Sequence, residues 1–383
     1  MQNPQPLNVA KPVKLIFAGG FLGSGKTTAL GVLARDLIRK GLRVGIVTND
    51  QSGNLADTVI VKQMLAELNV PIEEVVEGCF CCKFDDLIHS IEKILIYEPD
   101  ILLGEPVGSC TDFVAAVAHP IKIHYRDAFI FAPFSTMVDP DRLRELLLKE
   151  TESTFPEEVA YLFEKQLEEA DLIVLNKCDL LEPSEKDRLE RAIKDRFPGK
   201  EVLATSALQG DGMQTWLEIL LSGRPGADTV LRQIDYDRYA QAEAILGWLN
   251  AAVKVRSKGP IIPGEVMQGL LLTIRGALRQ RNAGIGHLKL VFTSAGKSTW
   301  ANLTDLRRDP RLGPQGHQTV SSSGTLLVNA RVKMAPVDLE TIVRDALTGV
   351  AESCSLQIDI VDLQCFSPAY PNPPYRMKEG GGS

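Results

Sequence analysis

The sequence lacks a long apolar run and a secretory leader. No stretch of its 383 residues reaches the roughly 20 apolar residues that a membrane-spanning helix needs. The N-terminal segment 1–14 is polar and proline-rich, with no long apolar run behind it, which is unlike a secretory signal. Both absences predict a cytoplasmic protein with no membrane partner.

The sequence also lacks an excess of positive charge and any strong compositional bias. The formal net charge is −7, and the apolar, charged, glycine and proline contents lie near those of ordinary globular proteins. An acidic chain is poorly suited to phosphate backbones, so we predict no nucleic-acid partner. The composition argues against a disordered, collagen-like or repeat protein, and the length is enough for two domains with a core each.

Cysteine is scarce and unevenly placed. The seven cysteines are an odd number, and three of them, Cys79, Cys81 and Cys82, lie within four residues. In a reducing compartment this distribution favours metal-binding or buried thiols over a framework of disulfides.

The first half of the chain alternates short apolar runs with amphipathic segments. Such alternation predicts an α/β fold, with a mostly parallel sheet covered by helices on both faces. Ligands of such a sheet bind at the carboxyl ends of its strands. The predicted strands are Val13–Ala18, Leu42–Thr48, Glu73–Val76, Asp100–Leu103, Ala128–Phe134, Leu172–Asn176 and Glu201–Leu203, and the predicted helices are Thr27–Lys40, Val59–Leu68 and Phe84–Ile96.

A glycine- and proline-rich break at 222–226 separates this half from a different pattern. The order strand–helix–strand–strand–helix–strand beyond it predicts a smaller α+β domain of the ferredoxin-like type. Its first strand is expected at Gln241–Val255, and Asp305–Gly324 is expected to form a long hairpin loop. The predicted divisions are a flexible tail (1–12), the first domain (13–225), a linker (226–239), the α+β domain (240–366) and a surface tail (367–383) whose glycine-rich end is typical of a cloning linker.

A phosphate-binding motif follows the first predicted strand. The sequence GFLGSGKT at 20–27 matches G-x-x-x-x-G-K-[ST] in every fixed position, and a predicted helix follows it. Its glycines let backbone N–H groups face an anion, to which the helix adds its positive end. We expect Lys26 to reach the β- and γ-phosphates and Thr27 to bind Mg²⁺; an ordinary glycine-rich turn would not explain the agreement of motif and context. The predicted nucleotide-binding residues here are Gly20, Gly23, Ser24, Gly25, Lys26, Thr27 and Thr28.

Two carboxylates follow predicted strands at the same edge of the sheet. Phosphoryl transfer needs hard oxygen ligands for Mg²⁺ and a group that orients water, and Asp50 and Glu105 are placed for these tasks. Gly108 is expected to bring its N–H to the γ-phosphate. Asp50 or Glu105 could instead only cap the next helix, and Asp57 competes with Asp50 for its role. The predicted catalytic residues are Lys26, Asp50 and Glu105, and the predicted magnesium ligands are Thr27, Asp50 and Glu105.

A second motif predicts which base is bound. The segment Asn176-Lys177-Cys178-Asp179 follows an apolar strand and matches the N/T-K-x-D element of GTPases. Guanine offers adjacent N1–H and N2–H donors that the Asp179 carboxylate accepts, whereas adenine lacks them. Ser206-Ala207, after a further strand, is similar to the element that backs the base in GTPases. We therefore predict GTP and GDP as ligands in preference to ATP, with Asn176, Lys177, Asp179, Ser206 and Ala207 at the base.

The cysteine cluster predicts a site for a transition metal. Thiolates prefer Zn²⁺ and softer ions to Mg²⁺, so Cys79, Cys81 and Cys82 are the predicted ligands. So compact a run cannot easily surround an ion, which leaves room for a fourth ligand or an open position. Glu77 and His89 are candidates, although His89 fits a solvated helix face better. The glycine and acidic residues nearby favour an exposed turn over three core cysteines.

The order of these motifs resembles that of CobW-type GTPases. GGFLGSGKTT at 19–28, EGCFCC at 77–82, GEPVG at 104–108 and NKCD at 176–179 occur in the family's order, and the family is similar to the metal-delivery GTPases for urease and hydrogenase. The resemblance identifies 13–225 as a P-loop GTPase domain and 240–366 as the family's smaller domain. It implies that GTP hydrolysis drives delivery of a transition metal, Zn²⁺ or Co²⁺, to a client metalloenzyme or corrinoid-related protein.

The resemblance leaves several functional points open. It is compatible with a nucleotide-dependent homodimer, whereas the five scattered histidines argue against the bulk metal storage expected of relatives with a histidine-rich tract. One alternative is a nucleotide-gated assembly or reactivation factor whose metal site is structural. Another is an ATP-dependent small-molecule kinase. No arginine finger is evident, so turnover is expected to be slow without a partner.

Overall fold

The structure is a computed structural model, and it describes residues 7, 9–51, 56–313 and 321–376. Most of the predicted N-terminal tail and the glycine-rich C-terminal end lie outside these ranges. Within them, no helix combines the length and apolarity needed to cross a bilayer.

The first domain is built on a parallel sheet. Its strands run in the order β3-β2-β4-β1-β6-β7-β8, and β5 also pairs with β1. The pairs are parallel throughout, as expected when strands are joined by crossover helices. The strands are β1 (Val13–Gly19), β2 (Val44–Asn49), β3 (Ile72–Val75), β4 (Ile101–Glu105), β5 (Phe129–Phe131), β6 (Ser135–Val138), β7 (Leu172–Leu175) and β8 (Glu201–Ala204).

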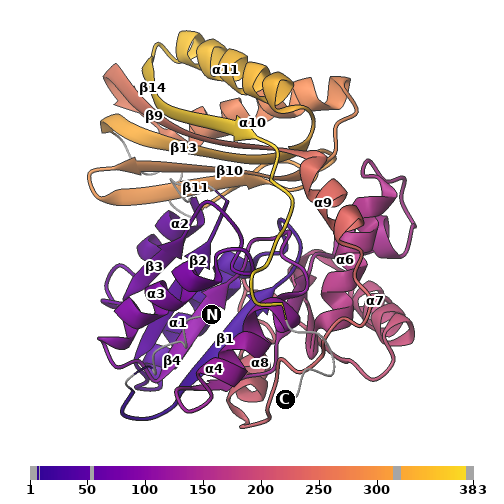
Figure 1. Ribbon diagram of the computed structural model, residues 1–383. Helices are drawn as coiled ribbons and strands as arrows, with labels where there is room; N and C mark the ends of the chain where they lie inside the picture. The colour runs from indigo at the N-terminus through magenta and orange to yellow at the C-terminus, as the bar shows by residue number, and fades with distance from the viewer. Residues whose placement is uncertain (1–6, 8, 52–55, 314–320, 377–383) are drawn as a thin grey trace.

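Helices cover both faces of this sheet (Figure 1). One buried core lies under α1 and α8, and another lies under α3, α4, α6 and α7. The helices are α1 (Lys26–Arg39), α2 (Ala56–Met64), α3 (Phe84–Leu95), α4 (His119–His124), α5 (Pro140–Arg142), α6 (Glu157–Glu169), α7 (Pro183–Arg196) and α8 (Met213–Leu221), with π-helical turns η1 (Val114–Ala118) and η2 (Leu143–Leu147) and the 3-10 turn η3 (Cys178–Leu180).

The second domain is an antiparallel sheet with two helices on one face. The strand order β12-β11-β10-β13-β9-β14 contains the ferredoxin-like core β14-β9-β13-β10, to which β11 and β12 add an edge. Its elements are β9 (Leu246–Ile261), α10 (Pro263–Gln280), β10 (Ile285–Ser294), β11 (Lys297–Leu303), β12 (Arg311–Leu312), β13 (Ser321–Lys333), α11 (Pro336–Ser353) and β14 (Gln357–Phe366). The preceding helix α9 (Tyr236–Ala244) packs on α6 of the first domain. The predicted fold class is confirmed.

Three local predictions were wrong. The segment expected to start the first strand of the second domain, Gln241–Ala244, is the end of α9, and the strand begins at Leu246. The predicted hairpin loop Asp305–Gly324, of which 314–320 lie outside the described residues, contains the short strand β12 and the start of β13 and follows the unpredicted strand β11. Only Phe129–Phe131 of the predicted strand Ala128–Phe134 forms a strand, β5, and the strand stops before Pro133, which has no N–H for a ladder.

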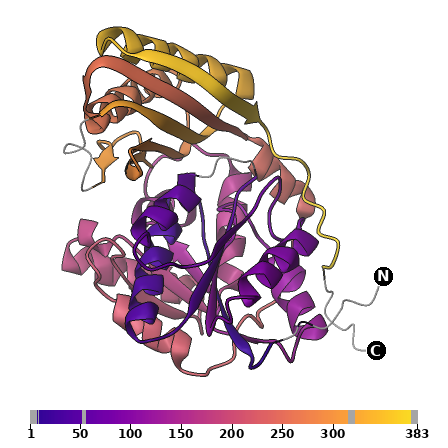
Figure 2. The same ribbon diagram turned by 90° about the vertical axis from the view of Figure 1, so that its left-hand side faces the viewer.

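The antiparallel sheet lies over the carboxyl ends of the parallel strands (Figures 1 and 2). Its helices α10 and α11 cover the far face, so the face without helices is turned to the first domain. A Cβ at Gly23 of the phosphate loop would lie 2.9 Å from Thr304 Cγ2 and 3.2 Å from Gly286 O, both in the second domain. This contact brings the second domain directly to the predicted nucleotide site.

Candidate functional site

A cavity of about 390 Å³ lies where the two domains meet at the carboxyl ends of the parallel strands. The phosphate loop, α2, the end of β4, segments that follow β6, β7 and β8, and the edge of the antiparallel sheet form its walls. It brings together residues that the sequence assigned to phosphate, magnesium and base. The predicted residues in its lining are Gly23, Gly25, Lys26, Thr27, Thr28, Glu105, Asn176, Lys177, Asp179 and Ala207.

The loop between β1 and α1 has the backbone that its glycines allow. Gly20 and Gly25 have φ angles of 125° and 95°. A Cβ at Gly20 would lie 2.2 Å from Met137 O, and one at Gly25 would lie 2.5 Å from Asn176 Nδ2. Only glycine fits these positions without a shift of the neighbours. Lys26 Nζ donates to Gly20 O at 2.7 Å, and burial lowers the pKa of Lys26 to about 8 although Glu105 opposes the shift.

Three oxygen-bearing side chains converge beside the loop. Thr27 Oγ1 lies 2.9 Å from Asp57 Oδ1 and 3.0 Å from Glu105 Oε1. Burial and the negative charge of Asp57 raise the pKa of Glu105 to about 7. Burial alone would raise the pKa of Asp57, but the Lys289 ammonium outweighs it and lowers that pKa to about 2.

This group of oxygens fits a hard divalent cation. Glu105 Oε2 is buried and has no hydrogen-bond partner within the described residues. Mg²⁺ prefers carboxylate and hydroxyl oxygens, and Thr27, Asp57 and Glu105 would hold it. Bound there, it would neutralise charge on the phosphates.

Asp50 lines a small cavity together with Lys26, Asp57 and Glu105, but its side chain is bound by the second domain. Its carboxylate accepts from Arg331 Nη2 at 2.8 and 3.0 Å and from Asn329 Nδ2 at 3.2 Å, both on β13. Within the described residues Asp57, not Asp50, is the second carboxylate beside Thr27. The roles of Asp50 in magnesium binding and catalysis remain predictions, and Asp57, its competitor, has the better position.

The predicted base-binding residues form one hydrogen-bonded unit. Asn176 Nδ2 donates to Ser24 O at 2.8 Å, and Asn176 Oδ1 accepts from Ala207 N at 3.0 Å. Ser206 Oγ donates to Asp179 Oδ1 at 2.7 Å. These bonds tie the base-recognition element to the phosphate loop and orient the Asp179 carboxylate. The geometry suits the role predicted for Asp179, which stays a prediction.

The second domain supplies the opposite wall of the cavity. Trp300 and Arg311, on β11 and β12, line it, and Arg311 Nη2 lies 3.9 Å from Asp179 Oδ2. On the first domain, Lys177 Nζ lies 2.5 Å from Asp139 Oδ2. The sequence predicted no contribution from the second domain to this pocket.

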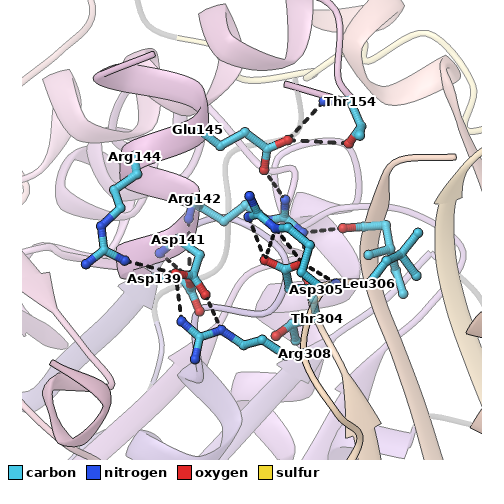
Figure 3. A network of polar contacts seen from close by, with 12 residues as sticks. Asp139, Asp141, Arg142, Arg144, Glu145, Thr154, Thr304, Asp305, Leu306 and Arg308 are labelled. Carbon is cyan, nitrogen blue, oxygen red and sulfur yellow. Dashed lines mark hydrogen bonds and ion pairs between the residues drawn. The ribbon is translucent and has the colours of Figure 1, made fainter. Parts of the chain in front are cut away.

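A polar network fastens the two domains beside the cavity (Figure 3). Arg142, at the end of α5, donates to Thr304 O at 2.6 Å and pairs with the buried Glu145. Arg308 binds Asp141 with two hydrogen bonds of 2.6 and 2.9 Å. Paired guanidinium–carboxylate contacts of this kind fix orientation as well as distance.

The three predicted metal ligands lie together. The sulfur atoms of Cys79, Cys81 and Cys82 all lie within 4.8 Å of one another. Hydrogen bonding to neighbouring thiols, Cys110 first, holds the pKa of Cys79 well below its usual range. Hydrogen bonding to Cys110 and Cys79 raises the pKa of Cys81 well above it.

The sequence did not single out Cys110, which lies beside this group but is not one of the three residues whose sulfurs all lie within 4.8 Å of one another. Its Sγ lies 4.0 Å from Cys81 Sγ. Four sulfurs around a tetrahedral Zn²⁺, with Zn–S bonds of about 2.3 Å, lie about 3.8 Å apart. The signal in the sequence was its place two residues after Gly108, in the loop that follows β4. Glu77 and His89 are not in the group of converging ligand atoms found among the described residues, and His89 faces Glu92.

The expectation of an exposed cysteine turn was wrong. Cys79 and Cys81 are 4% and 1% exposed, and both pack into a hydrophobic core. The expected surface tail also packs here, because Asn372 N donates to Cys82 Sγ at 3.3 Å and Arg376 pairs with the buried Asp112. An ion would reach the sulfurs through the side of Cys82, the half-buried member of the group.

Comparison with known proteins places the chain in a family. Residues 14–204 match the family described as CobW/HypB/UreG, nucleotide-binding domain. A Sinorhizobium protein named zinc chaperone CobW is 29% identical over 202 residues, which cover 48% of this chain and 56% of that protein. A zinc-regulated GTPase metalloprotein activator of Dictyostelium discoideum is 27% identical over 222 residues, which cover 51% of this chain and 46% of that protein.

Both comparisons are partial, since the chain spans about half the length of these curated relatives. Among solved structures, Zn(II)-bound YjiA GTPase from E. coli is 14% identical, with a TM-score of 0.36 and coverage of 89% of this chain and 99% of that one. A TM-score this low adds nothing to the argument. The family match and the four motifs carry the conclusion that this chain belongs to the CobW/HypB/UreG family and is of the CobW type.

Proposed function

We propose that the protein is a GTP-dependent metallochaperone that binds a transition metal through its cysteine cluster and delivers it to a client metalloprotein in the cytoplasm. The relatives named zinc chaperones make Zn²⁺ the first ion to test, with Co²⁺ second. A client metalloenzyme or corrinoid-related protein and a nucleotide-dependent homodimer belong to the same proposal.

One observation carries it: a single loop joins the nucleotide site to the sulfur cluster. Glu105, which contacts Thr27, and Gly108, which lies beside the phosphate loop, precede Cys110 by five and two residues in the same segment. A Cβ at Gly108 would lie 3.1 Å from Leu22 N. A loop that shifts when a γ-phosphate binds and is hydrolysed would therefore move one sulfur of the cluster. Metal affinity would then depend on the nucleotide.

The coupling predicts different metal affinities in different nucleotide states. We expect competition with a chromophoric chelator to give distinct Zn²⁺ affinities for the nucleotide-free protein, the GDP complex and the complex with a non-hydrolysable GTP analogue. Coupling between two sites is typically worth a factor of about 5 to 150. Equal affinity in all three states would remove the coupling and leave the metal site structural.

Loss of one sulfur is expected to weaken the site strongly. We predict that Cys81→Ser lowers Zn²⁺ affinity by at least about 100-fold, because a hydroxyl replaces a soft thiolate ligand. Cys110→Ser should lower the sulfur-to-cobalt absorption of the Co²⁺-loaded protein by about a quarter if four thiolates bind the ion. Cys354→Ser, which removes an exposed thiol at the end of α11, is the matched control and should change neither. A Co²⁺ spectrum that Cys110→Ser leaves unaltered would limit the site to three sulfurs.

The burial of Cys79 and Cys81 favours one other function, a nucleotide-gated assembly or reactivation factor with a structural metal. A structural site contributes its binding energy to folding, so chelation should then unfold the protein. Reversible removal of the metal with the fold intact would support the chaperone instead. Client loading that survives Cys81→Ser would support the assembly factor.

A further inference from the structure

Lys289, a residue of the second domain, lies at the phosphate end of the nucleotide cavity. Its Nζ is 2.5 Å from Asp57 Oδ1, and that same oxygen is 2.9 Å from Thr27 Oγ1. The ammonium is therefore one carboxylate away from the hydroxyl of the phosphate-binding motif. It is also close enough to Lys26 for its charge to lower the pKa of that lysine, after burial as the main cause.

The position follows from strand alternation in β10. Leu288 and Leu290 are fully buried and belong to the core beneath α10 and α11. Alternate residues of a strand point to opposite faces, so His287 and Lys289 face the first domain. β10 lies between β11 and β13 in the sheet, which gives Lys289 a rigid support.

The start of β10 is held on the phosphate loop. Ile285 O accepts a hydrogen bond from Arg142, and a Cβ at Gly286 would lie 2.8 Å from Leu22 Cδ1. Lys289 is three residues further along the strand. The same contacts that join the domains thus fix the distance between its ammonium and the loop that cradles phosphate.

The charged groups at this end of the cavity indicate which anion Lys289 would contact once a nucleotide binds. Two ammonium groups, Lys26 and Lys289, face two carboxylates, Asp57 and Glu105. A triphosphate brings further negative charge to this place, and a carboxylate that binds magnesium no longer needs a lysine partner. The nearest anion left to Lys289 is then the terminal phosphate.

We propose that Lys289 contacts the terminal phosphate of bound GTP and stabilises the negative charge that develops there during hydrolysis. The inference rests on the proposed GTPase function. Lys289, from the second domain of the same chain, would take the place of the arginine finger that was not evident in the sequence. In the reaction the oxygen of water bonds to the γ-phosphorus, and the bond to the oxygen that bridges the β- and γ-phosphates breaks. The water proton ends on the released phosphate, and GDP leaves with the bridging oxygen and its electron pair.

A purely structural ion pair is the alternative. Lys289 and Asp57 are only 17% and 20% exposed, and the cost of desolvating such a pair offsets much of the attraction between the two charges. Other contacts already join α2 to the antiparallel sheet, such as that of Ser298 N with Gln63 Oε1 at 3.1 Å. A purely structural role would therefore not require the ammonium of Lys289 to extend into the nucleotide cavity.

The test compares the full-length wild-type chain with Lys289→Gln, Lys289→Arg and the control Lys297→Gln, an exposed lysine of β11. Single-turnover GTP hydrolysis with Mg²⁺ and the affinities for GDP and a non-hydrolysable GTP analogue are measured for each. We expect Lys289→Gln to slow hydrolysis about 100-fold and to lower analogue affinity about tenfold, with GDP affinity changed less than about twofold. Lys289→Arg should retain much of the rate, and Lys297→Gln should match the wild type.

Two results would overturn the inference. The first is a Lys289→Gln protein that hydrolyses GTP at the wild-type rate with an unchanged preference for the analogue over GDP. The second is an equal loss of affinity for both nucleotides, which would show a structural role. If the wild-type chain binds GTP without hydrolysing it, the proposed GTPase function fails, and the preference for the analogue over GDP alone decides whether Lys289 contacts the phosphate.

Discussion

Replacing Asp179 by asparagine is expected to change the preferred base from guanine to xanthine, with a shift in relative affinity on the order of 10⁴. In the wild-type pocket the carboxylate oxygens would accept from N1–H and N2–H of guanine, and Ser206 Oγ donates to Oδ1 at 2.7 Å. Xanthine keeps N1–H but carries a carbonyl oxygen at C2. The asparagine side chain can accept a hydrogen bond from N1–H of xanthine and donate one to its C2 carbonyl oxygen. With guanine, the asparagine N–H would face the guanine amino group, and two donors cannot form a hydrogen bond.

Binding of the base would also break the ion pair between Arg311 and Asp179, which is weak. Arg311 Nη2 lies 3.9 Å from Asp179 Oδ2, and the arginine side chain is 42% exposed. Such a pair is worth at most about 1 kcal/mol. The Asp179 carboxylate, by contrast, loses both base donors when the wrong base binds, which is why the discrimination is large.

The measurement is a competition between GTP and XTP for the wild-type chain and for Asp179→Asn. Asp187→Asn is the matched control, since it makes the same change of charge at a 67% exposed carboxylate on α7. It should leave the preference for GTP intact. A variant Asp179→Asn that still prefers GTP would show that the carboxylate does not recognise the base.

The sequence was informative wherever one short segment carries both a local structure and its chemistry. The run 20–27 predicts its own strand–loop–helix context, because each glycine is needed by the backbone there. The same holds for 176–179, whose side chains bind the phosphate loop and the neighbouring strand end. The alternation of apolar runs gave the parallel sheet for the same reason, since periodicity is a local property.

The residues that were missed depend on contacts between distant segments. Lys289 was missed and Asp57 was named only as a competitor of Asp50, because the two are 232 positions apart and the packing of the second sheet on α2 brings them together. Cys110 joins the other thiols from 29 positions beyond Cys81. Asp50 lies at the strand end where it was expected, but its carboxylate is bound by Arg331, which is 281 positions away. Local patterns carry no signal for such pairs.

Arg331→Met is expected to lower the free energy of unfolding by about 3–5 kcal/mol, because it leaves a buried carboxylate without its cation. The Arg331 side chain is 1% exposed and its guanidinium lies 4.1 Å from the centre of the Trp248 ring. Its two hydrogen bonds to Asp50 cross from the second domain to the end of β2. After the substitution, Asp50 keeps Asn329 as a side-chain donor but no positive charge.

Urea denaturation followed by tryptophan fluorescence measures the loss, since Trp248 lies against Arg331. Arg344→Met is the matched control, because that arginine makes a half-exposed pair with Glu340 on α11 and its loss should cost less than about 1 kcal/mol. A cost for Arg331→Met as small as that of the control would mean that the buried pair does not hold the domains together.

The double variant Asp50→Asn/Arg331→Met then separates the two roles of Asp50. Removing both charges leaves no buried ion, so much of the lost stability should return. If Asp50 serves only to join the domains, the double variant should bind Mg²⁺ and GTP almost as the wild type does, because Thr27, Asp57 and Glu105 are untouched. If Asp50 is a magnesium ligand, stability should return while the magnesium dependence of GTP binding stays impaired. The structure favours the first result, since the Asp50 carboxylate is already bound by Arg331 and Asn329.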